Sequence, residues 1–372
     1  MTTRARILEP TPENVRKVAQ ILRSGGIAGL PTETVYGLAG NAMDPSALAK
    51  IFNAKERPTF DPLIVHVAQG NSQITALEKL NLINKTWLSA HAQELANQLF
   101  AAFWPGPFTL VLPKNDAVPD LATSGLPSVA LRMPSHPVAQ ALLVEAGFPL
   151  AAPSANRFGR ISPTSATDVG MELGDRIEYI LDGGPCEIGL ESTVIAMGQD
   201  GTLTLLRPGG IAVAEIERVS GVQVRGPGTT AGPSPTPMLA PGMLASHYAP
   251  EKALVLLPDV ILKLSSAQIL KTFPFQPKGQ IGLLLFSGDV QATLQKLLEA
   301  HGPALGPPHF HAKSLSSGGQ LEEAARNLFS DLRHLDSLEN VDFILAEPCP
   351  VRTGLGHAIS DRLQRASQRG LS

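Results

Sequence analysis

Residues 225–250, RGPGTTAGPSPTPMLAPGMLASHYAP, constrain the fold of this 372-residue chain more than any other stretch. Proline has no backbone N–H, and its ring clashes with a preceding helical turn. A segment this rich in proline and glycine therefore cannot form a helix or a central strand. The segment predicts a linker between two domains, residues 1–224 and 251–372, and both lengths are ordinary for one domain.

The composition narrows the class of protein. Hydrophobic residues make up 43% of the chain and charged residues 17%, which is typical of a globular protein with a buried core. The net charge of -3 gives no general attraction to nucleic acid or to an acidic membrane. The two cysteines are too few for a disulfide framework, and the N-terminal sequence lacks the apolar core of a signal peptide. We expect a cytoplasmic protein without membrane contact.

The first domain has the pattern of an α/β fold. Its strand-like segments are IAGL, LIVHVA, FTLVLP, VALRMP, FPLAAP, IEYILDGG, STVIAM and LTLLRPGG. In DPSALAKIFNAKERP we expect a helix with Asp44 as the N-cap, Pro45 at the first helical position and a stop at Pro58. Several strands follow one another without a helix between them, so we expect a mixed sheet.

The second domain alternates strands and helices more regularly. ALVLLP, GQIGLLLFSG and VDFILAEPC are nearly continuous apolar runs, as in strands that are covered on both faces. QATLQKLLEAH, QLEEAARNLFSDLRHL and AISDRLQRAS supply helices between and after them. The pattern predicts a small Rossmann-like α/β domain.

Several common motifs are missing from the sequence. It contains no G-x-x-x-x-G-K-[ST] phosphate loop, no G-x-S-x-G nucleophile elbow and no H-E-x-x-H zinc motif. Cys186 has no evident histidine base beside it in the sequence, so we expect it to be inert. A site in this chain must use other residue types.

Cations at the ends of predicted elements are the first candidates for such a site. Lys55 and Arg57 lie at the end of a predicted helix, where interaction with the helix dipole is the simplest interpretation. Arg132 and Arg207 each end a predicted strand just before a proline. Guanidinium groups that converge there would bind phosphate or carboxylate.

Small polar residues cluster in three further segments. GLPTETVYGLAGNA places hydroxyl and carboxylate groups directly after an apolar run, AAPSANRFGRISPTS contains Ser154, Asn156 and Ser162, and GLESTV precedes another apolar run. Each could be an ordinary turn, and His66 could be a hydrogen-bonded core histidine. Their number at the ends of strands favours a ligand site.

Seven segments in order carry a family resemblance. They are GLPTETVYGLAGNA, KERPTFDPLIVHV, FWPGPFTLVL, VALRMPSHP, LAAPSANRFGRISPTS, ESTVI and LRPGG. In this order they closely resemble the threonylcarbamoyl-AMP synthases. With PGMLASHYAP in the linker, the chain is similar to the two-domain type, which has a YrdC-like catalytic domain and a smaller Rossmann-like C-terminal domain.

The resemblance implies an activity and a set of ligands. The family condenses L-threonine, bicarbonate and ATP into L-threonylcarbamoyladenylate and releases pyrophosphate, with Mg²⁺ accompanying the ATP. The product would pass to a tRNA threonylcarbamoyl transferase system that modifies the adenosine beside the anticodon. We expect at most weak binding of tRNA by the chain itself.

The resemblance also assigns roles to residues. Lys55 and Arg57 would be the catalytic cations. ATP would be bound by Lys55, Arg57, Asp61, Ser154, Asn156, Ser162, Arg207 and Tyr248. Threonine would be bound by Thr34, His66, Arg132, Ala152, Ser192 and Thr193. The linker, with His247 and Tyr248, would fold over the cavity as a lid.

One position departs from the family pattern. Many relatives have Asn where this chain has Asp61, just before PLIVH. A carboxylate near ATP is unfavourable unless it binds Mg²⁺ or points away from the phosphates.

Two other classes of protein remain as alternatives. A YrdC-like module that binds RNA without catalysis is one, although the negative charge and the lack of interleaved aromatic and basic residues speak against it. A carbamoyl-transfer maturation enzyme is the other, but it would bring cysteine-rich zinc modules that two cysteines cannot supply.

Overall fold

The computed structural model describes residues 5–226, 247–274, 277, 279–301 and 310–368. The chain divides into two compact units, Met1–Phe158 with Ser162–Leu244 and Gly159–Ile161 with Ala245–Ser372. Most of the expected linker and lid, residues 227–246, lies outside the described residues. The division into domains at 224 and 250 therefore stays a prediction.

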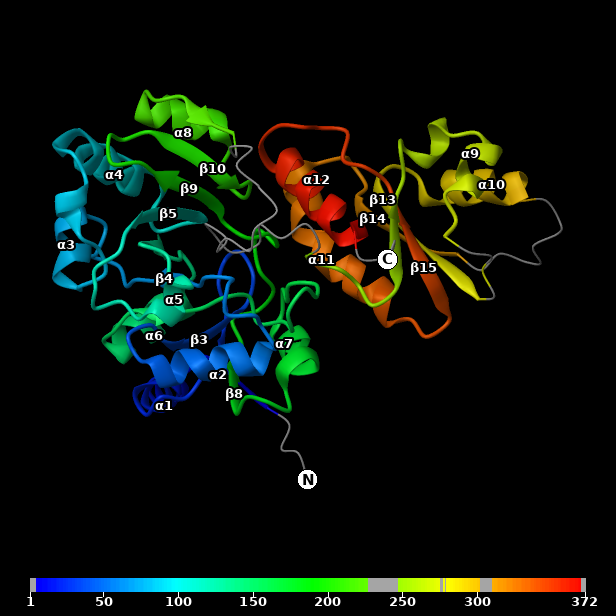
Figure 1. Cartoon of the computed structure of the whole chain (residues 1–372). Coiled ribbons are helices and arrows are strands. Elements are labelled where there is room, and N and C mark those ends of the chain that lie inside the picture. Colours follow the sequence, from blue (N-terminus) through cyan, green and yellow to red (C-terminus); the bar gives the residue numbers. More distant parts are fainter. Residues whose placement is uncertain (1–4, 227–246, 275–276, 278, 302–309, 369–372) are drawn as a thin grey trace. The chain divides into compact units, whose positions relative to one another are not determined.

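A single large sheet organises the first unit (Figure 1). Its strands are β1 (Arg6–Leu8), β2 (Ala28–Leu30), β3 (Gly37–Asn41), β4 (Ile64–His66), β5 (Phe108–Pro113), β6 (Ser128–Arg132), β7 (Leu150–Ala151), β8 (Tyr179–Leu181), β9 (Thr193–Met197), β10 (Leu203–Arg207) and β11 (Val224–Arg225). They lie in the order β1-β8-β2-β3-β7-β4-β6-β5-β9-β10-β11. Strand β5 pairs antiparallel with β6 and parallel with β9, so the prediction of a mixed sheet is confirmed.

Helices connect these strands. They are α1 (Pro12–Arg23), α2 (Pro45–Lys55), α3 (Ile74–Lys79), η1 (Lys85–Trp87), α4 (Ala90–Phe103), α5 (Asp120–Thr123), α6 (Pro137–Ala146), α7 (Ala166–Leu173) and α8 (Val213–Ser220). The Asp44 side chain caps α2 by accepting a hydrogen bond from the backbone N–H of Ser46, as expected. The helix ends at Lys55 rather than near Pro58, because Glu56 adopts a left-handed conformation (φ 53°).

The two faces of this sheet differ. One face carries the main core, in which Val65, Leu110 and Leu131 pack with residues of α2, α3, α4, α7 and α8. On the other face, α1 and α6 cover the half of the sheet that contains β8, β2, β3 and β7. Over β4, β6, β5, β9 and β10 this second face carries a small apolar cluster, Ile64, Val111, Ala130, Val194 and Leu206. We call this half of the second face the site face.

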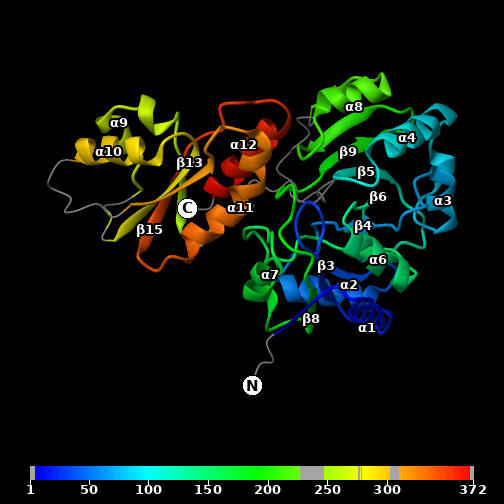
Figure 2. The same cartoon turned by 180° about the vertical axis from the view of Figure 1, so that it is seen from behind.

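The second unit has a four-stranded sheet (Figure 2). Its elements are β12 (Ala253–Leu256), η2 (Ile261–Lys263), α9 (Ser266–Lys271), β13 (Gln280–Ser287), α10 (Val290–His301), β14 (Phe310–Ser316), α11 (Leu321–Ser337), β15 (Val341–Ala346) and α12 (Gly354–Ser367). The strand order is β12-β15-β13-β14, and all neighbours are parallel. Helices α9 and α10 lie together on one side of the sheet, and α11 and α12 on the other (Figures 1 and 2). The Rossmann-like expectation is confirmed.

Candidate functional site

Two of the polar segments singled out in the sequence lie side by side. The backbone N–H of Leu38 donates to the carbonyl of Pro153 at 2.7 Å, and the N–H of Ala155 donates to the carbonyl of Tyr36 at 2.8 Å. A bridge between Gly37 and Ser154 joins the same segments. The loop between β2 and β3 and the loop after β7 are therefore joined by hydrogen bonds, and we call these two loops the wall of the candidate site.

Lys55 ties the end of α2 to this wall. Its ammonium donates to the carbonyl of Asn156 at 2.6 Å and also to the carbonyl of Ser154, while its side chain is only 1% exposed. Burial, reinforced by the nearby Arg57, lowers the pKa of Lys55 well below its usual value. Because the ammonium binds carbonyls of another segment, the helix dipole alone does not explain this residue.

Arg57 is held by a loop that follows α2. Its Nε donates to the carbonyl of Asp61 at 3.0 Å and its Nη2 to the carbonyl of Pro62 at 2.8 Å. Its Nη2 also lies 2.9 Å from Oδ2 of Asp61, and both side chains are buried. Burial raises the pKa of Asp61. The positive charges of Arg57, Lys55 and Arg207 lower this pKa but do not cancel the effect of burial. Asp61 thus lies among three of the predicted site cations.

Arg132 ends β6 and contacts the PTET segment. Its Nη1 donates to Oγ1 of Thr34 at 2.8 Å, and its Nη2 donates to Oε1 of Glu33 at 2.6 Å. Its Nε reaches the carbonyl of Gly106 at 3.3 Å. A guanidinium of which every nitrogen is bound has a fixed orientation, which a carboxylate-binding group requires.

His66 lies beside Arg132 on the site face, because the two residues are register partners in β4 and β6. Burial, together with the charge of Arg132, lowers the pKa of His66 to about 3, so the ring is neutral at physiological pH. Its Nδ1 has no hydrogen-bond partner among the described residues. Backbone groups of Ile64 and Leu150 also act on the ring through hydrogen bonds. The threonine contact expected of His66 stays a prediction.

Arg207 is the fourth cation, and a β-bulge directs it onto the site face. The register between β9 and β10 shifts between Leu205 and Arg207, so that Arg207 lies opposite Val194. Its Nη2 donates to the carbonyl and to the hydroxyl of Ser192, both at 3.1 Å. The Ser192 hydroxyl also lies 2.7 Å from that of Thr109, the register partner of Arg132.

The remaining predicted residues of the first unit lie around this face. Ser162 donates to Oε1 of Glu191 at 2.5 Å, and Thr193 donates to the carbonyl of Ile211 at 2.7 Å. The backbone N–H of Ala152 donates to the carbonyl of Ile64 at 3.1 Å, next to the β4 strand that carries His66. Ser162, Thr193 and Ala152 are buried, as the four cations are.

Tyr248 belongs to the second unit. Its ring is 1% exposed, stacks on Phe329 with centroids 5.5 Å apart, and lies 5.0 Å from the guanidinium carbon of Arg362. His247 contacts the same ring edge-on, at 4.1 Å between centroids. The ATP contact expected for Tyr248 and the lid expected of the linker stay predictions.

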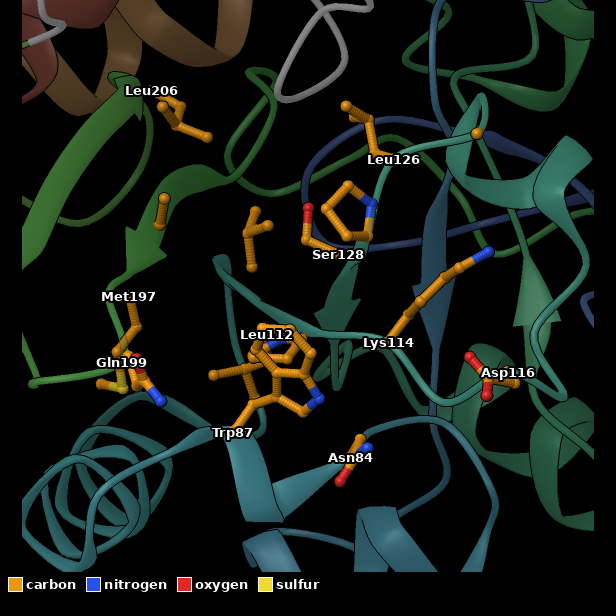
Figure 3. A pocket seen from close by; sticks show the side chains of 15 residues that line it. Asn84, Trp87, Leu112, Lys114, Asp116, Leu126, Ser128, Met197, Gln199 and Leu206 are labelled. Carbon is orange, nitrogen blue, oxygen red and sulfur yellow. The ribbon is translucent and has the colours of Figure 1, made fainter.

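A pocket of about 730 Å³ lies at the other end of the site face. Its lining includes Val111, Pro113 and Ser128 from β5 and β6, and Ala196 and Leu206 from β9 and β10. Figure 3 shows Leu206, Met197 and Gln199 along one side of the pocket and Lys114 and Asp116 along the other. Along β5, the same face presents Thr109, then Val111 and then Pro113, so the pocket begins about 7 Å from Thr109.

Sequence reasoning did not assign three residues that the structure places at or near the site. Glu33 and Thr109 bind predicted site residues directly, and Trp87, which is 62% exposed, lines the pocket. The signal for Thr109 was available, because strict alternation in FTLVLP separates Thr109 and Val111 from the core leucines. No sequence signal pairs Glu33 with Arg132, which lies far away in the chain.

Two kinds of structure are absent from the described residues. They contain no group of three or more His, Cys, Asp or Glu side chains that could hold a metal ion. Among the same residues, no helix is both long enough and apolar enough to cross a membrane.

Family profiles match nearly the whole chain. Residues 20–209 match the Sua5/YciO/YrdC profile, described as telomere recombination. Residues 211–368 match the profile of the threonylcarbamoyl-AMP synthase C-terminal domain.

Individual relatives match the chain over its length. It is 40% identical over 356 residues to the threonylcarbamoyl-AMP synthase of Pyrococcus abyssi, covering 95% of this chain and 94% of that protein. It is 39% identical over 364 residues to the threonylcarbamoyl-AMP synthase of Bacillus subtilis, covering 97% and 94%. The crystal structure of P. abyssi Sua5 complexed with L-threonine superposes with a TM-score of 0.79 at 36% identity, covering 98% of each chain.

Proposed function

This chain belongs to the threonylcarbamoyl-AMP synthase family, and we propose that it makes L-threonylcarbamoyladenylate from L-threonine, bicarbonate and ATP with release of pyrophosphate. The finer reaction class is that of a nucleotidyltransferase. The product is used to modify the adenosine beside the tRNA anticodon, through a separate transferase system. A cytoplasmic location stays a prediction.

One observation supports this function above others, namely the grouping of four buried cations. Lys55, Arg57 and Arg207 lie near Asp61, and Arg207 and Arg132 share the site face. Lys55, Arg57, Arg132 and Arg207 are each at most 8% exposed. A triphosphate, bicarbonate and an amino-acid carboxylate repel one another strongly in a cavity of low dielectric constant. Fixed guanidinium and ammonium groups offset that repulsion without reorganising during the reaction.

The site would act by assembling its substrates. The amine of threonine attacks bicarbonate to give a carbamate, and a carbamate oxygen then attacks the α-phosphorus of ATP while pyrophosphate leaves. This scheme uses no protein nucleophile. Rate would come from holding the reactants together and from stabilising the charge that develops on the phosphates. We assign threonine to the end of the site face that carries Thr34, His66 and Arg132.

The pocket described above is a candidate site for the adenosine of ATP. Its volume of about 730 Å³ lies in the range of small-molecule sites. Leu206 lines it, and the next residue, Arg207, is one of the cations assigned to the nucleotide. The exposed ring of Trp87 and the aliphatic floor suit a planar base, while Ser128 and Gln199 offer neutral hydrogen-bonding groups.

Mg²⁺ would accompany the triphosphate. Asp61 suits this role, because its Oδ1 is buried and has no hydrogen-bond partner in the described ranges. Mg²⁺ is commonly bound by one or two carboxylates together with substrate phosphates. When bound, the ion would neutralise phosphate charge, and Asp61 is the residue that would hold it.

The activity is tested by measuring pyrophosphate release from ATP, with threonine and bicarbonate each omitted in turn. Release should require both. Equal release without an amino acid would contradict the proposal. The alternative, an RNA-binding module without catalysis, predicts no release together with a salt-dependent tRNA shift.

A further inference from the structure

Glu33 is a buried carboxylate at the threonine end of the site, and one of its two oxygens is unpaired. The residue is 3% exposed, and its Oε1 accepts a hydrogen bond from Nη2 of Arg132 at 2.6 Å. Its Oε2 has no hydrogen-bond partner in the part of the chain that the structure describes. A buried carboxylate oxygen without a donor is costly, so this atom indicates a donor that comes from a ligand.

The pair formed by Arg132 and Glu33 matches the charges of an amino acid. An α-amino acid carries its carboxylate and its ammonium on the same carbon, so the two charges lie within a few ångströms of each other. A guanidinium and a carboxylate that touch can therefore bind both groups at once. The contacts of Arg132 with Thr34 and Gly106 fix the guanidinium in this arrangement.

Building on the proposed function, we propose that Glu33 binds the ammonium of threonine through Oε2 and accepts the proton that the amine must lose before it reacts. Glu33 would then be a catalytic residue that acts on the amino group, beside the residues that bind the carboxylate.

The step balances in atoms and charge. Transfer of one proton from the ammonium to Glu33 leaves a neutral amine and a protonated carboxyl group. The amine nitrogen then bonds to the carbon of bicarbonate, and the elements of one water molecule leave, one hydrogen coming from the amine and a hydroxyl group from bicarbonate. The product is the carbamate anion. Glu33 returns its proton to solvent when the product leaves.

The other titratable groups around Glu33 are poor proton acceptors. The guanidinium of Arg132 on β6 has no acceptor atom, and the pKa of His66 on β4 is lowered to about 3 by burial and by Arg132. Burial, with a contribution from the Glu33 charge, raises the pKa of the Cys186 thiol far above its usual value, and Asp168 on α7 adds to this effect. The Cys186 thiol therefore keeps its proton, and the His66 ring takes one up only in strong acid.

The test compares wild type with Glu33→Gln in the full chain. The amide oxygen of Gln can still accept the bond from Arg132, but it cannot take a proton. With wild type showing threonine-dependent pyrophosphate release, we expect kcat of E33Q to fall by roughly a hundredfold near pH 7, the scale for loss of an acid or base. The threonine Kd should rise by less than about tenfold, and the deficit should shrink towards pH 9.5 as free threonine loses its own proton.

A ratio of variant to wild-type kcat that stays constant with pH would overturn the proposal, because a purely structural role of Glu33 predicts a constant deficit. If thermal melting shows that E33Q is unfolded, the same kinetic comparison is made with Glu33→Asp. Its carboxylate is set back by one methylene, so we expect a smaller deficit that also shrinks as pH rises, and a constant deficit would again overturn the proposal. If wild type itself shows no threonine-dependent release, the proposed function fails instead.

Discussion

Arg57 and Asp61 form an ion pair inside the protein, with Nη2 and Oδ2 2.9 Å apart and side-chain exposures of 4% and 0%. The simplest interpretation of Arg57 from the sequence, interaction with the helix dipole, does not account for these contacts. An interaction with a helix dipole contributes less than about 1 kcal/mol to stability when the charge is exposed. Removing one member of a buried pair leaves the other charge uncompensated, which costs about 3–5 kcal/mol.

Arg57→Ala should therefore lose both stability and activity. We expect the free energy of unfolding to fall by about 3–5 kcal/mol, because Asp61 would be left buried without its partner. Turnover should fall on the order of a hundredfold, the scale for one lost charge contact in a transition state. Urea denaturation and pyrophosphate release measure the two effects.

Arg23→Ala is the matched control for this variant. Arg23 pairs with Glu145 at 3.5 Å on the surface, with side-chain exposures of 44% and 37%, and such pairs contribute about 0–1 kcal/mol. An Arg57→Ala protein that is as stable as Arg23→Ala would contradict the buried pair.

His66 predicts a pH dependence of stability. Its pKa falls from 6.5 to about 3 on folding, so between these values the unfolded chain binds a proton that the folded chain does not. The free energy of unfolding should therefore decrease as pH falls from 6.5 towards 3, by up to about 5 kcal/mol in total from this residue. The measurement is the difference between wild type and His66→Asn across this range. The difference should change by about 1.4 kcal/mol per pH unit, and a flat difference would contradict the neutral, buried ring.

Thr109→Val tests the support for the threonine end of the site. The substitution keeps the shape of the side chain but removes the 2.7 Å contact with the Ser192 hydroxyl. Stability should fall by about 1 kcal/mol, the net contribution of one hydrogen bond. The KM for threonine should rise several-fold while the KM for ATP stays the same. An equal rise in both constants would show that Thr109 supports the whole face rather than Ser192.

Much of the fold could be predicted because local patterns determine it. The N-cap Asp44 and the apolar runs of β13 and β15 have clear signals in the sequence. Strand β14 was not predicted, because it lies at the edge of its sheet and most of its side chains are only half-buried. Strand β3 is rich in glycine, which strands usually avoid, and a Cβ atom at Gly40 would lie only 3.0 Å from Cδ1 of Ile51.

The cations and the polar segments of the site could be predicted, but most of their contacts could not. Arg132 and Arg207 could be singled out, because each ends an apolar strand before a proline. Two contacts, that of Arg132 with Glu33 and that of Thr109 with Ser192, join segments that are distant in sequence, and no local pattern encodes them. The cations expected at the site are thus found in the structure together with a carboxylate, Glu33, to which the sequence assigned no role.

Ala196→Trp tests the assignment of the pocket to adenosine. Ala196 lines the pocket from β9, so an indole there should fill the space that the base would occupy. We expect the KM for ATP to rise tenfold or more, equivalent to at least about 1.4 kcal/mol of lost binding. Threonine binding to the nucleotide-free protein, measured by calorimetry, should not change, because Arg132 and Thr34 lie at the other end of the site face.

Met171→Trp, on α7 at a position that is 51% exposed, is the control for adding an indole, and it should leave the KM for ATP and the threonine Kd at their wild-type values. An Ala196→Trp protein that is folded and has a wild-type KM for ATP would place the base elsewhere. A loss of threonine binding in the same variant would instead mean that the substitution distorts the whole sheet. In that case Leu206→Ala, which enlarges the pocket, should be tested for a selective change in nucleotide affinity.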